Sequence, residues 1–216
     1  MTEHGYKEMR RAMVASQLRT TGVSDPAVVA AMGEVPRERF VPADRIALAY
    51  SDAPIPLKPG RDLNPPMTLG RLLNEAGPVA GERALVVGAA TGYSAALLSR
   101  LVGPVTALEE DAELAAIAKT ALAGTPVRLV EGPLAKGWRK GAPYDLILID
   151  GAVETVPKAL IDQLVEGGRI ATALVDDGVT RLCVGHRAGD GFGLVAFADA
   201  SASILPGFAK PGAFTF

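Results

Sequence analysis

The chain has 216 residues, 49% of them hydrophobic, which predicts one globular domain or one domain with an appended element. A formal net charge of −2 excludes a strong positive field, so we expect no nucleic-acid partner and no attraction to an anionic membrane. The single cysteine, Cys183, has no CxxC partner and the two histidines lie far apart, so we expect no metal site and favour a reducing, cytoplasmic location.

The N-terminal part reads as short helices and proline-rich turns. It opens with MTEHGYKEMRR, which has no apolar segment, so we expect no secretory signal. No apolar run in the sequence approaches the roughly 20 residues that a membrane span needs, so we expect none. In SDPAVVAAMGEV, Ser24 or Asp25 is a suitable N-cap and Pro26 lies in the first turn, which predicts a helix to about Glu34. The prolines at both ends of VPRERFVP block helix continuation, so this stretch is predicted to be a connector.

From residue 83 the pattern alternates between apolar runs and helical stretches. The apolar runs are RALVVG (83–88), VTALE (105–109), VRLVEG (127–132), YDLILID (144–150) and GRIATALV (168–175). The helical stretches are YSAALLSRL (93–101), DAELAAIAKTAL (111–122) and PKALIDQL (157–164). Continuous apolar strands separated by helices predict an α/β fold with a doubly wound, mainly parallel sheet buried on both faces.

Two further elements complete the predicted organisation. RLCVGH and FGLVAFA flank a turn at Gly189-Asp190-Gly191, which predicts a C-terminal antiparallel hairpin at the sheet edge. We place a boundary near Gly77, which divides the chain into an N-terminal helical cap (1–77) and a Rossmann-like unit (78–216). The cap is expected beside the carboxyl edge of the sheet.

The stretch LVVGAATGYSAALL (85–98) contains the first strand-to-helix turn, where ligands of such sheets bind. Gly88 and Gly92 allow unusual dihedral angles and close approach of a ligand to the backbone. The spacing matches neither the dinucleotide pattern G-x-G-x-x-G nor a phosphate loop. The alternative is that both glycines only make a tight turn.

Glu109 ends the second strand, roughly 20 residues beyond the glycine turn, where a carboxylate can accept hydrogen bonds from two ribose hydroxyls. This spacing favours a nucleoside ligand, with Glu109 at an otherwise exposed strand end. The alternative is a solvated glutamate in the acidic run 109–111.

The segment MVASQLRTTGVSDPAVVAAMGEVPRERFVPADRIALAYSDAPIPLKPG, residues 13–60, resembles the amino-terminal signature of the protein-L-isoaspartate O-methyltransferases. Later pieces follow the family's order: GAATGY, a glutamate after strand two, GAPYDLILIDGA and VPKALIDQLVEGGRI. The VPRERFVP and AYSDAPIP elements are specific to this family, whereas the glycine turn is common to many methyltransferases.

The resemblance implies a class I S-adenosylmethionine-dependent fold and methyl transfer to an isoaspartyl carboxylate in protein repair. Isoaspartyl-containing proteins or peptides would be the partners. It assigns cofactor binding to Gly88, Ala90, Gly92, Tyr93 and Glu109. A carboxylate acceptor is ionised at neutral pH, so alignment in a water-poor site replaces a strong general base.

The chain departs from the family at the acceptor loop, where GRDLNPP stands for the family's GQTISQP. Asn64 takes the position of the serine and can donate a hydrogen bond to a carboxylate, as can Arg61 with its charge. Asp62 adds a negative charge that would repel such an acceptor. The alternative is that the loop is simply a rigid proline-rich turn.

Other departures concern the cofactor. Val86 occupies the family's acidic position, Ala90 its middle glycine, and Pro133 the place of an aspartate that reaches the adenine. We therefore expect weaker S-adenosylmethionine binding than is usual in the family.

Asp150 ends the predicted fourth strand, where the family tends to have a neutral residue. An anion there disfavours a carboxylate acceptor unless something pairs with it, so Asp150 is a candidate for selecting an amine or hydroxyl instead. Its alternative is a helix cap or a partner for a nearby arginine. Trp138, a lone tryptophan in a loop, is expected to pack against the core.

Three interpretations remain open: an isoaspartyl methyltransferase with a divergent site, a methyltransferase with another acceptor, and a non-catalytic homologue. We rank the first above the others, as a monomer or small homo-oligomer.

Overall fold

The computed structural model describes residues 2–210. The strands are β1 (Ile55–Lys58), β2 (Arg61–Leu63), β3 (Ala84–Val87), β4 (Val105–Glu109), β5 (Val127–Glu131), β6 (Tyr144–Val153), β7 (Leu164–Asp176), β8 (Val179–Ala188) and β9 (Gly191–Asp199). The α-helices are α1 (Glu3–Met13), α2 (Pro26–Glu34), α3 (Pro66–Ala76), α4 (Tyr93–Leu98), α5 (Ala112–Ala121) and α6 (Lys158–Ile161). Short 3-10 or π-helical segments are η1 (Val14–Leu18), η2 (Arg19–Thr21), η3 (Arg37–Phe40), η4 (Ala43–Leu48), η5 (Leu134–Lys136) and η6 (Arg139–Gly141).

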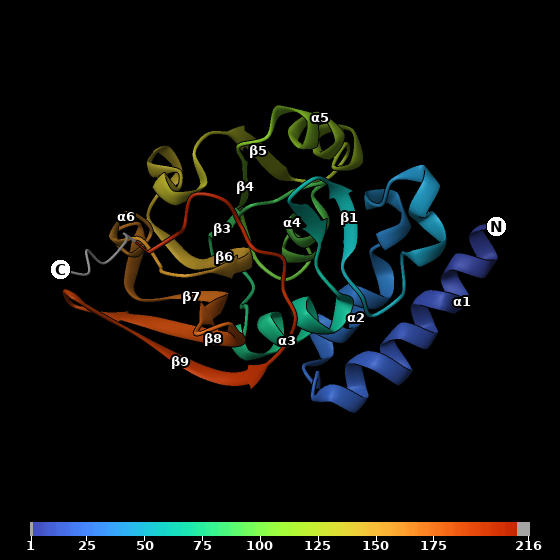
Figure 1. Cartoon of the computed structure of the whole chain (residues 1–216), viewed down its shortest axis with the longest axis horizontal. Helices are drawn as coiled ribbons and strands as arrows, with labels where there is room; N and C mark the ends of the chain where they lie inside the picture. The colour runs from blue at the N-terminus through green and yellow to red at the C-terminus, as the bar shows by residue number, and fades with distance from the viewer. Residues whose placement is uncertain (1, 211–216) are drawn as a thin grey trace.

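A seven-stranded sheet in the order β5-β4-β3-β6-β7-β8-β9 forms the centre of the molecule (Figure 1). The first five strands of this order are parallel, and β8 and β9 run antiparallel to their neighbours. The predicted α/β fold class is confirmed. Strand order reverses between β3 and β6, so a crevice is expected at the carboxyl ends of these two strands.

Both faces of the sheet are covered, which explains the continuous apolar runs. Ala84 and Val86 of β3 belong to an apolar cluster that includes residues of α2, α3, α4 and α5. The alternate residues Leu85 and Val87 belong to a second cluster on the opposite face, with Leu160 of α6. Because side chains alternate along a strand, each strand contributes to both layers of the core.

Several predicted boundaries were wrong, and two of them lie in and after β6. The fourth strand, β6, continues past Asp150 to Val153, because Ala152 and Val153 pair with β7 and Ala152 also bridges to Ile204. The predicted helix 157–164 is only the short α6, since Leu164 already pairs with Tyr144 in the sheet. In each case a partner strand distant in sequence decided the local conformation.

The N-terminal elements follow their local signals. The Asp25 side chain accepts hydrogen bonds from the backbone N–H groups of Ala27 and Val28, so of the two candidate N-caps Asp25 is the one used, and α2 ends at the predicted Glu34. The VPRERFVP stretch is a connector that contains the single short segment η3, as its prolines predict.

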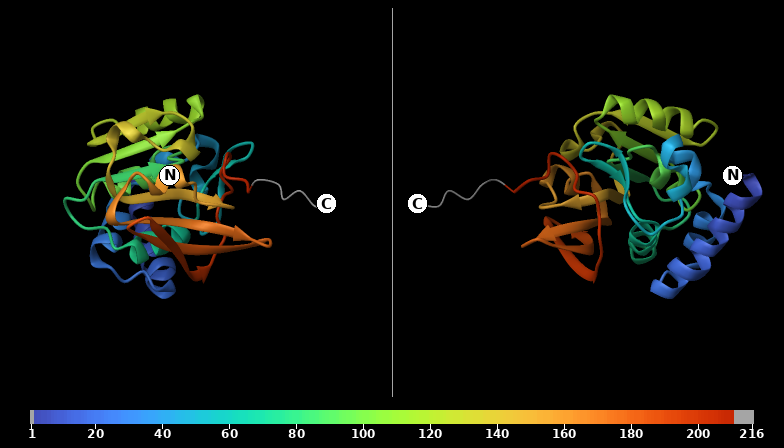
Figure 2. Two further views of the ribbon diagram at one scale, coloured as in Figure 1. Left: turned by 90° about the vertical axis from the view of Figure 1, so that its left-hand side faces the viewer. Right: turned by 45° about the vertical axis from the view of Figure 1, so that its right-hand side comes forward.

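The N-terminal cap reaches the carboxyl edge of the sheet, as predicted. The Thr91 hydroxyl, in the turn after β3, donates to the Phe40 carbonyl at 2.7 Å, and Arg61 contacts Glu109 at the end of β4. One apolar cluster includes residues from both sides of Gly77, so the division at that point stays a prediction. Figure 2 (right) shows the blue N-terminal helices and the orange-red β8–β9 hairpin on opposite sides of the molecule.

The predicted C-terminal hairpin is confirmed. Strands β8 and β9 pair antiparallel from Arg181–Asp199 to Ala188–Gly191, and β9 is the edge strand. Within residues 2–210, no helix combines the length and apolar character needed to cross a bilayer.

Arg169 of β7 joins three parts of the fold in a buried position. Its guanidinium forms a bidentate pair with Glu82 at 2.8 Å and donates to the backbone carbonyls of Ala76 and Gly77 at the end of α3. We predict that Arg169→Ala lowers the free energy of unfolding by about 2–3 kcal/mol, because Glu82 and the helix-end carbonyls lose their partner. Urea unfolding measures this loss.

The matched control is Arg181→Ala on β8, whose half-exposed ion pair with Asp199 spans 3.7 Å. It should change stability by no more than about 0.5 kcal/mol. Equal losses in the two variants would contradict a structural role for the Arg169 pair.

Candidate functional site

The glycine turn lies at the carboxyl end of β3, at the point where strand order reverses. Gly88 and Gly92 have φ values of 77° and 98°, which explains the need for glycine at both positions. Ala90, at the family's middle glycine, also has a positive φ of 50°. This left-handed conformation costs an alanine about 1 kcal/mol relative to glycine.

Glu109 is fully buried, which corrects the expectation of an exposed strand end. Its two carboxylate oxygens accept a bidentate pair of hydrogen bonds from Arg61, each at 2.7 Å. The backbone N–H groups of Ala90, Glu110 and Asp111 donate to the same carboxylate at 2.7–3.0 Å. Five donors therefore meet one carboxylate, and its hydrogen-bonding capacity is used within the chain.

The Arg61–Glu109 pair stays charged in spite of its burial. Burial alone would raise the pKa of the Glu109 carboxyl, but the Arg61 guanidinium and the backbone N–H donors together hold that pKa below its usual value. Contact with Glu109 likewise raises the pKa of Arg61, against the effect of its own burial. Arg61 was expected to donate to an acceptor carboxylate; here it donates to a carboxylate of the chain itself.

Asn64, expected to donate to an acceptor, donates instead to Asp150. Its Nδ2 lies 2.8 Å from Asp150 Oδ1 and 3.1 Å from the Asp150 carbonyl oxygen. Its Oδ1 accepts from the backbone N–H of Ser203 at 2.8 Å. The carboxylate of Asp62 accepts from the Ser203 hydroxyl at 2.6 Å. Sequence reasoning missed Ser203, because nothing in its local sequence indicates this contact.

Arg37 is a second residue that sequence reasoning missed. The side chain is completely buried, donates to the carbonyls of Ala49 and Asn64 at 2.7 and 2.6 Å, and lies over the Tyr93 ring at 4.7 Å. VPRERFVP contains three charged residues, and no sequence signal distinguishes the buried one. Burial raises the pKa of Asp150, and the neighbouring Ser94 and Asn64 side chains and the charge of Arg37 only partly oppose this shift.

Three buried polar atoms in this region have no hydrogen-bond partner in the described part of the chain: Arg37 Nη1, Tyr93 Oη and Ser94 Oγ. Such atoms are rare in folded proteins and usually contact water or a ligand. Arg37 and Ser94 are neighbours of Asp150, and we call the region around Asp150 the polar end of the site.

Leu205 packs close to the glycine turn. A Cβ atom added at Gly88 would lie 2.9 Å from Leu205 Cδ1, and one added at Gly151 would lie 2.5 Å from Leu205 Cγ. Leu205 itself is buried, in the apolar cluster that contains Leu85 and Ile147. The side chain therefore lies against the backbone just after β3 and within β6.

The remaining candidates lie around this arrangement. Val86 is fully buried in β3, and Trp138 packs against the apolar cluster that contains Leu134, as expected for a packing residue. Within residues 2–210, no three His, Cys, Asp or Glu side chains come together as a metal site would require.

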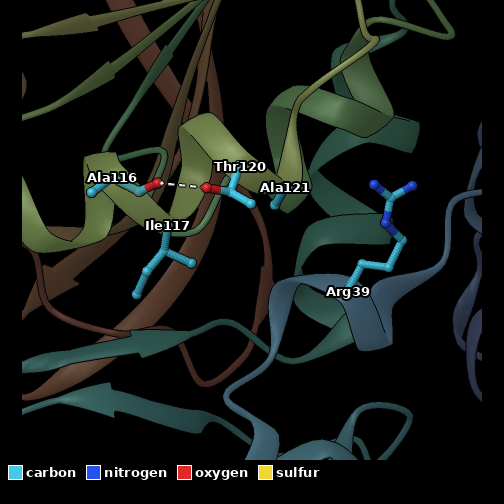
Figure 3. Close-up of a pocket in the computed structure, with 5 residues that line it drawn as sticks. All are labelled: Arg39, Ala116, Ile117, Thr120 and Ala121. Carbon is cyan, nitrogen blue, oxygen red and sulfur yellow. Dashed lines mark hydrogen bonds between the residues drawn. The ribbon is translucent and has the colours of Figure 1, made fainter.

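Two surface hollows lie near η3 and α5. A cavity of about 520 Å³ lies between η3 and α5 (Figure 3), where Arg39 is the only charged residue of its lining. A second, of about 290 Å³, lies beside it and shares Arg39 and Ala121. Neither is lined by the glycine turn or by Glu109.

The Arg61–Glu109 pair generates a stability prediction. At pH 7, Glu109→Gln should lower the free energy of unfolding by about 3–5 kcal/mol, because a buried guanidinium loses its countercharge. Adding Arg61→Leu to that variant should restore part of the loss, since the unpaired charge is then removed. Urea unfolding of the two single variants and the double variant measures the coupling.

The pH dependence of this effect has a definite sign. A depressed carboxyl pKa stabilises the fold above the pKa of the unfolded chain, about 4.3, and the benefit disappears as pH falls through the folded value. The difference between wild type and Glu109→Gln should therefore shrink in acid. A difference independent of pH would show that the pair contributes no charge effect.

Asp150 should behave in the opposite way. Because burial raises its pKa, its ionised form destabilises the fold, and this cost appears as pH rises above about 3.9. Asp150→Asn retains an oxygen that accepts from Asn64, so it should unfold at an equal or higher urea concentration than wild type at pH 7. A large loss of stability would mean that the charge is compensated.

Comparison with known proteins places these features in a family. The family model "Protein-L-isoaspartate(D-aspartate) O-methyltransferase (PCMT)" matches residues 9–193. A protein-L-isoaspartate O-methyltransferase 1 of Rhodopseudomonas palustris is 39% identical over 168 residues, which cover 76% of this chain and 69% of the relative. A protein-L-isoaspartate O-methyltransferase of Methylorubrum populi is 41% identical over 163 residues, which cover 74% of this chain and 77% of the relative.

Solved structures agree with this match. One named protein-L-isoaspartate O-methyltransferase superposes with a TM-score of 0.80 at 25% identity, over 92% of this chain and 66% of its own. Another, from Plasmodium falciparum and described as being in complex with S-adenosyl-L-homocysteine, gives a TM-score of 0.74 at 18% identity over 93% of this chain and 97% of its own, which shows a shared fold. The chain belongs to the protein-L-isoaspartate O-methyltransferase family.

Proposed function

We propose that this protein transfers a methyl group from S-adenosylmethionine to the free carboxylate of isoaspartyl residues in proteins. The observation that carries the proposal is the family match over residues 9–193, which includes both the glycine turn and the acceptor loop. Gly88, Gly92 and Glu109 occupy the carboxyl ends of β3 and β4, where this class of sheet binds its ligands.

The residues that we assign to the cofactor lie at or just after the ends of β3 and β4, but the conformation described above does not fit an adenosyl ligand. Glu109 would have to accept hydrogen bonds from the ribose, and Arg61 and three backbone N–H groups already use its lone pairs. Leu205 lies against Gly88, where the ligand would have to approach the backbone. Cofactor binding therefore requires the side chains of Arg61 and Leu205 to move.

The acceptor end is similarly engaged. The two groups proposed to bind the acceptor carboxylate, Arg61 and Asn64, each donate to a carboxylate of the chain itself. Arg37 adds a buried positive charge with an unpartnered N–H group at the same place, and it joins them as a proposed acceptor contact. Alignment by such donors, with water excluded, is sufficient for methyl transfer to an ionised carboxylate.

The test is methyl transfer from labelled S-adenosylmethionine to a peptide that contains one isoaspartyl residue. We predict incorporation of base-labile label into this peptide and not into its ordinary aspartyl counterpart. The difference arises because the backbone of an isoaspartyl residue runs through its β-carboxyl group, which leaves the α-carboxylate free to accept the methyl group. Equal labelling of both peptides, or of neither at any enzyme concentration, would contradict the proposal.

A second candidate function is that of a non-catalytic homologue. The specific observation in its favour is the buried Glu109 carboxylate, whose lone pairs are used by Arg61 and backbone N–H groups, together with Leu205 packed close to Gly88. This candidate predicts no detectable binding of S-adenosylhomocysteine by calorimetry, whereas the enzyme must bind it. A third candidate function is that of a methyltransferase with another acceptor, which is favoured by Asp150 at the polar end of the site. It predicts that amine or hydroxyl acceptors are labelled in the methyl-transfer assay.

Partners and location complete the proposal. We infer isoaspartyl-containing proteins or peptides as substrates of a monomer or small homo-oligomer, with no nucleic-acid partner. The lone cysteine, Cys183, favours a reducing compartment, and cytoplasm is proposed for that reason.

A further inference from the structure

Three aspartates of this chain are followed directly by glycine, in the pairs Asp150-Gly151, Asp177-Gly178 and Asp190-Gly191. In such a pair the glycine amide nitrogen can attack the side-chain carboxyl carbon of the aspartate, because glycine has no side chain that hinders the approach. The attack needs an amide N–H that is free of other bonds and a backbone that can change its dihedral angles. The fold decides which of the three pairs meets these two conditions.

The pair Asp150-Gly151 is held within β6. The Asp150 carboxylate is buried and accepts a hydrogen bond from Asn64. The Gly151 carbonyl accepts from the Thr172 hydroxyl at 3.3 Å, and a Cβ atom on Gly151 would lie 2.8 Å from the Ser203 carbonyl oxygen. A rotation of this backbone would disrupt the sheet and its buried contacts, so the fold protects this pair from the reaction.

The pair Asp177-Gly178 forms the turn between β7 and β8, and both residues are exposed. The ladder ends at the pair Asp176–Val179, so the two turn residues lie outside it. Their φ values are 48° and 77°, as a two-residue type I′ turn requires. In the described part of the chain, neither the Asp177 side chain nor the Gly178 N–H has a hydrogen-bond partner, and the nearby cation of Lys210 contacts Asp176 instead.

The pair Asp190-Gly191 is an intermediate case at the tip of the β8–β9 hairpin. Asp190 is exposed, but Gly191 is already the first residue of β9 and pairs with Ala188 in the ladder. This turn is also held by a side chain, since the Gly189 N–H donates to the Glu166 carboxylate at 3.0 Å. The nitrogen that would attack therefore belongs to the paired part of the hairpin, which must open first.

We propose that Asp177 is a site of spontaneous isoaspartyl formation in this protein, and that the fold protects Asp150 and Asp190. The Gly178 nitrogen bonds to the side-chain carboxyl carbon of Asp177 and loses its proton, and one water leaves to give a cyclic imide. A water molecule then adds to the α-carbonyl carbon of Asp177, and the bond from this carbon to the nitrogen breaks. The chain now runs through the side-chain carboxyl group, and the α-carboxylate is free. One water leaves and one is taken up, so the mass does not change and nothing is oxidised.

The modification lengthens the backbone of the β7–β8 turn by one carbon atom. A two-residue turn matches the twist and the register of the strands that it joins, so the longer turn fits the ladder less well. The pairing of Asp176 with Val179, next to the turn, is the first that the isoaspartyl form should weaken. The site needs only an unpaired turn and water, and it does not depend on the proposed function.

The test is prolonged incubation of the folded full chain in near-neutral buffer, followed by digestion and mass spectrometry. Trypsin releases the peptide 170–181, which contains Asp177 and neither Asp150 nor Asp190. The isoaspartyl peptide keeps its mass but elutes separately, and electron-transfer fragmentation locates its extra backbone carbon. The isoaspartyl residue should form at Asp177 roughly tenfold faster, or more, than at the other two aspartates, because their backbones must open first.

The same chain unfolded in guanidinium is the control. Without the fold, the three Asp-Gly pairs should react at rates within about threefold of one another, because no segment is held closed. Equal rates at Asp177 and Asp190 in the folded chain, or no isoaspartyl residue at Asp177, would overturn the proposal.

A matched pair of variants, Asp177→Asn and Asp190→Asn, gives a second readout. Asparagine forms the same imide with loss of ammonia in place of water, so the subsequent hydrolysis leaves a measurable increase in mass. Asparagine also tolerates the positive φ of Asp177. In the folded state Asp177→Asn should deamidate roughly tenfold faster, or more, than Asp190→Asn, and the two rates should converge in guanidinium. A folded Asp190→Asn chain that deamidates as fast as Asp177→Asn contradicts protection by the ladder.

Discussion

The buried ion pair between Arg61 and Glu109 determines how the parts of this molecule fit together. Glu109 ends β4 in the central sheet, and Arg61 begins β2 in the cap, so the pair joins the two across the carboxyl edge. A charge buried there without a partner is costly, so each residue constrains the other's segment. The same carboxylate also accepts from the backbone of the glycine turn at Ala90, which ties the turn to the pair.

From this pair a continuous set of polar contacts extends through the site. Asp62 of the same hairpin and Asn64 just after it contact Ser203 of the segment that follows β9, and Asn64 also contacts Asp150 of β6. The two buried carboxylates are affected in opposite directions. Glu109 has a fully charged bidentate partner and a lowered pKa, whereas Asp150 has a neutral amide donor and a raised one.

The chain belongs to a methyltransferase family, and its glycine turn and Glu109 stand at neighbouring strand ends, those of β3 and β4. In the structure these groups are bonded to the chain itself: the Glu109 carboxylate accepts from Arg61 and from the backbone of the turn at Ala90. In the proposed function, a ribose would have to compete with Arg61 for this carboxylate.

Much of the fold was predictable from the sequence because it depends on local patterns. The apolar runs 84–87 and 105–109, the proline and aspartate at the start of α2, and the Gly189–Gly191 turn each express their conformation in a few adjacent residues. The positive φ angles at Gly88 and Gly92 likewise follow from a tight turn between a strand and a helix. The position of Glu109 at the end of β4 was predictable for the same reason.

What these residues contact was decided only by the tertiary structure. Arg61 and Glu109 are 48 residues apart and Asn64 and Ser203 are 139 apart, and no local pattern indicates which distant group a side chain will meet. The sequence by itself determined that a carboxylate stands at the carboxyl end of the second strand of a doubly wound sheet. Tertiary packing decided that this carboxylate is buried against an arginine and that Leu205 covers the turn, because burial and charge pairing depend on all segments that converge at one edge.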